Sequence, residues 1–326
     1  MKNWGEVIVV ENGDWRAYDW HWAGRRILDM LIGGPDLAHR HIQTFWRSDD
    51  RDFDWIAPES SGAVIDLDRH RLLFFGDELI DGPPHRRALM AVLADVWSGF
   101  EVVWAYGGTR ELAAYVGHDC PPALDGEPTA VVTSDRYSPC QLVSVVARDG
   151  AVRLWPLVDY HHPEAYGPAF LDALPGRGRR KVALKAIPAR GVHVDPSSKT
   201  VGVWWTADGS AVLDRLAEIW HGWNFEFWED RYEQQVARCV DGLRIPPLNW
   251  RAVVDEAEQS LRQRIFGCGW DSPASDALEL AERLRRIAPG FPVPDDAVLA
   301  GLVRPNADEW GRFAAACTAL RFAEAA

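Results

Sequence analysis

The sequence lacks the features that mark several large classes of protein. Its 326 residues contain five scattered cysteines, and no two of them have the C-x-x-C spacing of a zinc knuckle or a redox motif. No window approaches the roughly 18 consecutive apolar residues of a membrane-spanning helix. The N-terminal stretch MKNWGEVIVVENGD has only four apolar residues in a row, so we expect neither a signal peptide nor an anchor. We therefore expect a reduced, cytoplasmic protein with no membrane partner.

Several catalytic and nucleotide-binding fingerprints are also missing. The chain has no G-x-x-x-x-G-K-[ST], no G-x-G-x-x-G after a strand, no H-E-x-x-H and no G-x-S-x-G. Their absence disfavours a P-loop nucleotide site, a dinucleotide fold, a zinc protease and the commonest hydrolases. We expect neither a cofactor nor a bound metal.

Positive charge is scarce as well. The formal net charge is −13, which argues against nucleic acid as a partner, because such binders present a basic face to phosphates. One compact basic run, LPGRGRRK, contains Arg177, Arg179, Arg180 and Lys181. Its proline and glycines favour a solvated loop.

What the chain has in excess is tryptophan, with 17 residues in a sequence of otherwise ordinary globular composition. Several of them belong to an internal duplication. The run GAVID at 62–66 is matched by GVHVD at 191–195, and each is followed by a β-rich run. A helical pattern then leads to W-x-G in both copies, which pairs Trp97 with Trp220. These two tryptophans end apolar helical faces, so we expect them in the core.

Hairpin signals open each copy at Asn12-Gly13 and at Asp149-Gly150. We predict an α+β fold of two tandem homologous modules, each a mostly antiparallel sheet with helices on one face, plus a helical C-terminal segment. The predicted boundaries are 1–122, 123–243 and 244–326. The last region is interpreted as a small helical domain or as a buttress against the second copy, and Asn306 with Glu309 resembles a capping box there.

A short motif, D-[WY]-H, also recurs. Asp19-Trp20-His21 aligns with Asp159-Tyr160-His161. A carboxylate two residues from an imidazole can orient a general base, so Asp19, His21, Asp159 and His161 are the candidate catalytic residues. The alternative is a repeated turn or cap that was inherited with the module. His39 and His41 are also two residues apart, but we interpret them as ordinary buried or surface histidines.

Candidate binding residues are the aromatic side chains that the duplication does not place in the core. Trp204 and Trp205 are adjacent on a predicted strand, so one of them is exposed if one sheet face is solvated. Exposed aromatics on a sheet are typical of recognition surfaces. The candidates are Trp20, Trp22, Tyr160, Trp204 and Trp205.

Two classes of function follow. The first is a non-enzymatic protein that binds a protein partner, such as an immunity-type inhibitor, an adaptor or a chaperone. The second is an enzyme with a pocket between the modules, which binds a small-molecule substrate and uses the Asp/His pairs as acid and base.

Overall fold

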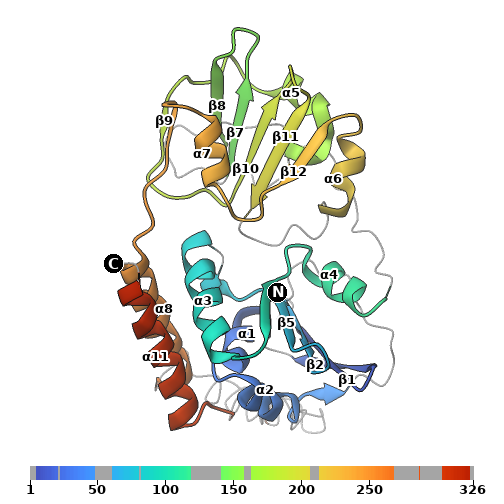
Figure 1. Cartoon of the computed structure of the whole chain (residues 1–326), viewed down its shortest axis with the longest axis vertical. Coiled ribbons are helices and arrows are strands. Elements are labelled where there is room, and N and C mark those ends of the chain that lie inside the picture. The colour runs from blue at the N-terminus through green and yellow to red at the C-terminus, as the bar shows by residue number, and fades with distance from the viewer. Residues whose placement is uncertain are drawn as a thin grey trace. The chain divides into compact units, whose positions relative to one another are not determined.

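The computed structural model describes residues 5–20, 23–47, 61–80, 82–118, 141–157, 163–205, 213–267, 286 and 303–323. The chain divides into two compact units. The first unit joins residues 1–80 and 84–121 to residues 249–326, and the second comprises 81–83 and 122–248. Each unit is built around one larger sheet (Figure 1).

The sheet of the first unit has six strands in the order β3-β2-β1-β4-β5-β6. They are β1 (Gly5–Glu11), β2 (Asp14–Trp20), β3 (Trp46–Arg47), β4 (Ser61–Asp66), β5 (Arg71–Phe75) and β6 (Glu101–Trp104). The antiparallel pairs β1–β2 and β4–β5 are joined side by side by the parallel pair β1–β4, and β6 pairs parallel to β5. Asn12 and Gly13 both have positive φ, at 56° and 76°, as a two-residue type I′ hairpin turn requires.

The sheet of the second unit repeats this plan. Its order is β12-β11-β10-β7-β8, and a separate two-stranded sheet pairs β9 with β13. The strands are β7 (Gln141–Val146), β8 (Val152–Leu157), β9 (Val182–Ala183), β10 (Arg190–Asp195), β11 (Thr200–Trp205), β12 (Asn224–Phe227) and β13 (Leu243–Arg244). Strands β8, β7, β10, β11 and β12 match β2, β1, β4, β5 and β6 in order and in the direction of every pairing. The predicted α+β fold with two similar modules is confirmed, and both sheets are mixed.

One buried tryptophan in each module makes the same hydrogen bond to the backbone. Trp97 and Trp220 are fully buried. The indole N–H of Trp97 donates to the Leu31 carbonyl at 2.7 Å, and that of Trp220 donates to the Glu164 carbonyl at 2.9 Å. A buried indole N–H needs such an acceptor. Each tryptophan therefore holds the connection that follows the first hairpin of its own module.

A glycine stands three residues after each of those carbonyls. Gly34 and Gly167 have positive φ, at 82° and 60°. A Cβ at Gly34 would lie 3.0 Å from the Val96 carbonyl oxygen, and one at Gly167 would lie 2.9 Å from the Ile219 carbonyl oxygen. Because Val96 and Ile219 directly precede the paired tryptophans, these contacts place the two glycines at equivalent positions.

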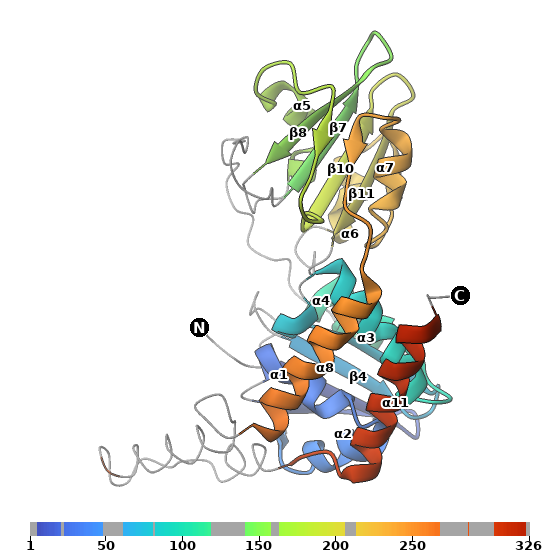
Figure 2. The same ribbon diagram turned by 90° about the vertical axis from the view of Figure 1, so that its left-hand side faces the viewer.

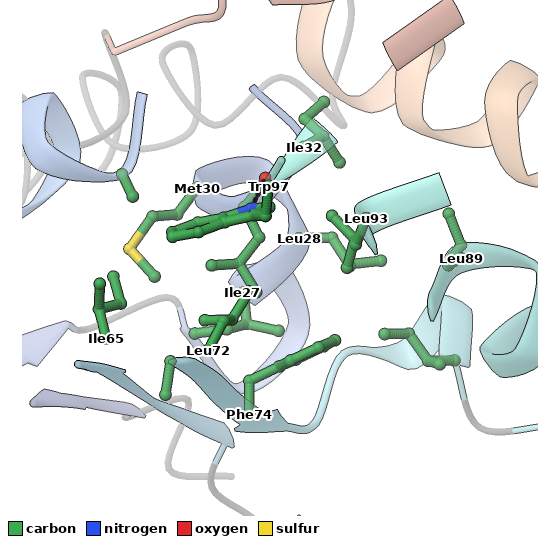
Figure 3. Close-up of a cluster of buried hydrophobic side chains, with 14 of the residues drawn as sticks. Ile27, Leu28, Met30, Ile32, Ile65, Leu72, Phe74, Leu89, Leu93 and Trp97 are labelled. Carbon is green, nitrogen blue, oxygen red and sulfur yellow. Dashed lines mark hydrogen bonds between the residues drawn. The ribbon is translucent and has the colours of Figure 1, made fainter. Parts of the chain in front are cut away.

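Helices cover both faces of the first sheet. The helices are α1 (Ala23–Leu31), α2 (Pro35–Ile42), α3 (Pro83–Val96) and α4 (Gly108–Tyr115). Figure 3 shows side chains of α1 and α3 around Trp97 on the face of Ile65, Leu72 and Phe74. The helix α4 lies on the opposite face, where the Tyr115 hydroxyl donates to Asp66 at 2.7 Å. The sequence predicted helices on one face only, and α4 extends that arrangement to the other.

The second module has the same distribution with shorter helices. They are the 3₁₀ segment η2 (Pro163–Ala169), α5 (Phe170–Ala173), α6 (Leu213–Ile219) and α7 (Glu233–Arg238). The amide of Gln235 in α7 donates to the Leu142 and Val192 carbonyls, at 3.1 and 3.0 Å, so α7 takes the place that α4 has in the first module.

The two long C-terminal helices belong to the first unit. They are α8 (Trp250–Phe266) and α11 (Ala307–Ala323), which lie side by side (Figure 2). Their buried side chains, among them Leu261 and Phe313, join the core of the first module. The C-terminal region was expected to form a small helical domain or a buttress against the second copy, whereas these two helices share the core of the first module. The capping box is present: Asn306 N–H donates to Glu309 at 2.8 Å, and Glu309 N–H donates to Asn306 at 2.9 Å.

A buried ion cluster ties α8 to the first module. The guanidinium of Arg264 donates to both carboxylate oxygens of Asp77 at 3.0 Å, and one of its nitrogens lies 2.6 Å from Asp29. Asp77 also accepts the N–H groups of Leu28 and Leu79, each at 3.1 Å. Within the described ranges, no helix has the length and apolarity needed to cross a membrane.

Candidate functional site

A pocket of about 220 Å³ lies between the β1–β2 hairpin and α2. Its apolar lining includes Val9 of β1, Ile42 of α2 and Ile65 of β4. Strand alternation explains the grouping, because Val9 is paired with Arg16 on one side and with Ile65 on the other, and cross-strand neighbours share a face. The pocket thus lies on the helix-covered face of the sheet, toward the hairpin end.

Polar side chains surround this apolar lining. Glu11, Asp14, Arg16 and Tyr18 come from the hairpin. Glu11 and Asp14 are the pair that flanks the turn, and both are exposed. The pocket therefore combines apolar walls with two carboxylates at its hairpin end.

The hairpin end is held by Asp68. Its two carboxylate oxygens accept the N–H groups of Asn12 and Gly13, both at 2.8 Å. These two hydrogen bonds lower the pKa of Asp68, because N–H donors favour the charged carboxylate. The turn is thereby fastened to the β4–β5 connection, which positions Glu11 and Asp14.

The helix α2 supplies the other wall. The amide nitrogen of Gln43 and Nε2 of His39 lie 2.9 Å apart at the edge of the pocket. The other histidine of this helix, His41, is buried with its ring 5.7 Å from that of Trp20. Burial lowers the pKa of His41 to about 3, so its imidazole is neutral. His39 and His41 thus belong to a helix, with one side chain at the pocket and one in the core.

The predicted exposed tryptophans are buried where the structure describes them. Trp20 is 4% exposed and stacks on Phe45 at 5.0 Å. Trp204 is 0% exposed and donates its indole N–H to Gln235 at 2.7 Å, and Trp205 is 1% exposed. The expectation of an exposed aromatic on β11 was wrong because side chains cover both faces of that strand. Trp22 and Tyr160 lie outside the described residues.

Of the four candidate acid–base residues, the structure describes only Asp19. Asp19 lies on β2, on the face opposite Trp20, and is paired with Glu6 of β1. Burial raises the pKa of Asp19. His21, Asp159 and His161 lie outside the described residues. Glu6 was missed, although the two-residue turn at Asn12-Gly13 fixes the register that sets it opposite Asp19.

The alignment of the two D-[WY]-H motifs was wrong. Gly5 pairs with Trp20 at the open end of the first hairpin, and Gln141 pairs with Leu157 at the open end of the second. Leu157, not Tyr160, is therefore the counterpart of Trp20. The second hairpin turn is one residue longer, and Asp159 comes after the end of β8.

Two side chains of the second module resemble a nucleophile–base pair. The Ser144 hydroxyl lies 2.8 Å from Nδ1 of His193, but both residues are buried. The Gln235 amide donates to the same hydroxyl at 2.8 Å. Burial lowers the pKa of His193 to about 4 and raises that of the Cys239 thiol to about 11. This polar network fastens α7 to the sheet, and its burial separates it from any substrate.

Among the described residues, no group of three His, Cys, Asp or Glu side chains is arranged to hold a metal ion. The pocket beside α2 is therefore the candidate site that the geometry supports best, through its shape and its charge. Comparison with known proteins finds no matching protein family, curated protein or solved structure.

Proposed function

We propose that this protein binds a basic protein partner through the pocket between the β1–β2 hairpin and α2. The observation that carries the proposal is the placement of Glu11 and Asp14 at the end of an apolar pocket. Lysine and arginine side chains combine an apolar stem with a cationic head, so they complement both parts of this pocket. The role is that of an inhibitor, adaptor or chaperone rather than that of a catalyst.

The charge of the whole chain supports the same class of partner. A net charge of −13 attracts a basic protein at long range and raises the association rate, most strongly at low salt. The local carboxylates then supply specificity, because they favour a cation at the hairpin end of the pocket. Arg16 at the same pocket disfavours a cation on its side and so restricts the orientation of the partner's side chain.

An enzymatic role draws less support from the described residues. It requires the pairs Asp19/His21 and Asp159/His161 to act as acid and base. Asp19 projects from the face of β2 opposite Arg16 and Tyr18, so it does not serve the pocket.

Fluorescence anisotropy with labelled nona-arginine tests the proposal, with the full chain as receptor. We expect the double variant Glu11→Gln/Asp14→Asn to weaken binding by about fivefold or more at low salt, because it removes the pocket's carboxylates and keeps its shape. The matched control, Asp95→Asn/Glu256→Gln, removes two exposed carboxylates that do not line the pocket. Equal losses in the two variants would mean general attraction to an acidic surface and would refute a specific site.

A further inference from the structure

The surface that lines the pocket in the first module is covered in the second module by the chain itself. Val7 pairs with Tyr18 in the first hairpin, and Val143 pairs with Trp155 in the second, so Trp155 is the counterpart of Tyr18. By the same register Arg153 is the counterpart of Arg16. Both modules therefore present an aromatic ring and an arginine at this place.

In the second module a short segment, residues 175–179, lies on the aromatic ring. The Trp155 indole N–H donates to the Pro175 carbonyl at 2.9 Å. Gly178 lies so close that a Cβ there would be 2.7 Å from the indole ring. Arg179 then exchanges two backbone hydrogen bonds with Leu154, at 2.8 and 2.9 Å. The segment turns at Gly176 and Arg177 as it crosses the ring, and the contact requires glycine.

Helix length explains why the first module has a pocket at this place. Pro35 and Pro168 follow the equivalent glycines, Gly34 and Gly167. The helix α2 continues from Pro35 to Ile42, whereas α5 ends at Ala173, shortly before Pro175 and Gly176 break the helical path. The chain of the second module therefore turns across its aromatic ring. Among the described residues of the first module, the corresponding space is the pocket.

The two modules differ in charge at the hairpin end. Glu11 and Asp14 of the first module stand where the second module has Ala147 and Ala151. In the second module the hairpin turn carries Asp149, which accepts hydrogen bonds from the Ala151 N–H and from Arg153, each at 3.1 Å. The hairpin carboxylate of the second module is thus paired with Arg153 of β8, whereas the first module places two carboxylates at the pocket.

We infer that the pocket of the first module takes a basic peptide segment that turns at glycine, with a glycine on the Tyr18 ring and an arginine against Glu11 and Asp14. The inference rests on the proposed function and names the form of the ligand. The chain's own residues 174–181, LPGRGRRK, show that form, because they cover the equivalent ring in the second module.

A labelled synthetic peptide of residues 174–181 tests the inference against the full chain. We expect it to bind, and we expect the same peptide with Gly178→Ala to bind about fivefold more weakly or worse, because the added methyl group collides with the ring. His39→Trp, which fills the pocket edge without changing formal charge, should weaken the glycine peptide to a similar extent. Ala94→Trp, on an exposed position of α3, is the matched control and should leave binding within about twofold.

The possible outcomes separate the two proposals. Equal binding of the glycine and alanine peptides, or no binding of either, overturns the inference of a glycine-containing peptide ligand. If nona-arginine still depends on Glu11 and Asp14 in that case, the proposed function stands. If nona-arginine loses that dependence as well, both proposals fail. Circular dichroism of His39→Trp and Ala94→Trp confirms that each variant is folded.

Discussion

Replacement of Arg264 by leucine tests whether the C-terminal helices are integral to the first unit. The change removes the cation that contacts Asp29 and Asp77 and leaves two buried carboxylates without it. Loss of one partner from a buried ion pair typically costs about 3–5 kcal/mol of unfolding free energy.

The free energy of protonating each carboxylate sets an upper limit on this cost. An isolated buried aspartate avoids its charge by taking up a proton, and from the ordinary pKa of 3.8 that costs about 4 kcal/mol per carboxylate at pH 7. At pH 5 the same step costs only about 1.6 kcal/mol. Burial raises the pKa of Asp29 even beside Arg264, and loss of the guanidinium raises it further. The variant's deficit therefore grows as the pH rises and shrinks as it falls.

Urea unfolding of Arg264→Leu beside the wild type, at pH 7 and pH 5, measures both effects. We expect a loss of about 3–5 kcal/mol at pH 7 and of less than half that at pH 5. Arg262→Leu removes an exposed arginine from the same helix and should cost less than about 0.5 kcal/mol. A deficit of under about 1 kcal/mol at pH 7, or one equal at both pH values, would refute the assignment of a charged buried cluster.

Three further predictions concern other residues. Acidification should destabilise the second unit, because His193 has a pKa of about 4 when folded and about 6.5 when unfolded. The contribution of His193 to the unfolding free energy is complete above pH 6.5 and falls by roughly 3 kcal/mol towards pH 4. A urea midpoint that does not change between pH 7 and 5 would contradict this. Trp97→Phe and Trp220→Phe should each cost about 2–3 kcal/mol in urea unfolding, because a buried carbonyl loses its donor and a cavity forms; losses below about 1 kcal/mol would show that the indole hydrogen bonds are dispensable. Asp68→Glu keeps the charge but alters the geometry of the two hydrogen bonds from the Asn12 and Gly13 N–H groups. It should weaken nona-arginine binding about twofold to fivefold in the anisotropy assay, and unchanged affinity would show that Asp68 does not contribute to the site.

Local sequence patterns predicted much of the fold. The duplication, the hairpin turn at Asn12-Gly13 and the capping box at Asn306 each depend on residues close together in the chain, where backbone conformation and hydrogen bonding are set locally. The core position of the paired tryptophans followed from their place at the end of apolar helical faces. These features concern how each module is built.

Features that depend on distant contacts were not predictable in the same way. Alternation along β11 indicated that Trp204 and Trp205 point to opposite faces, but it carried no information on whether a helix covers each face. The three-residue likeness of the D-[WY]-H motifs carried no information on strand register, which makes Leu157 the counterpart of Trp20. The pocket depends on where α2 ends relative to the hairpin. Glu11 and Asp14, which flank the turn, were the available sequence signal for it.

Hydrogen–deuterium exchange of the full chain with saturating nona-arginine locates the binding site. Binding at the pocket should concentrate slowed exchange in residues 9–18 and 35–43, the hairpin and the helix that line it. Glu11→Gln/Asp14→Asn should abolish that protection, whereas Asp95→Asn/Glu256→Gln should retain it. Protection spread over the acidic surface, or confined to segments away from the pocket, would rule out this pocket as the binding site.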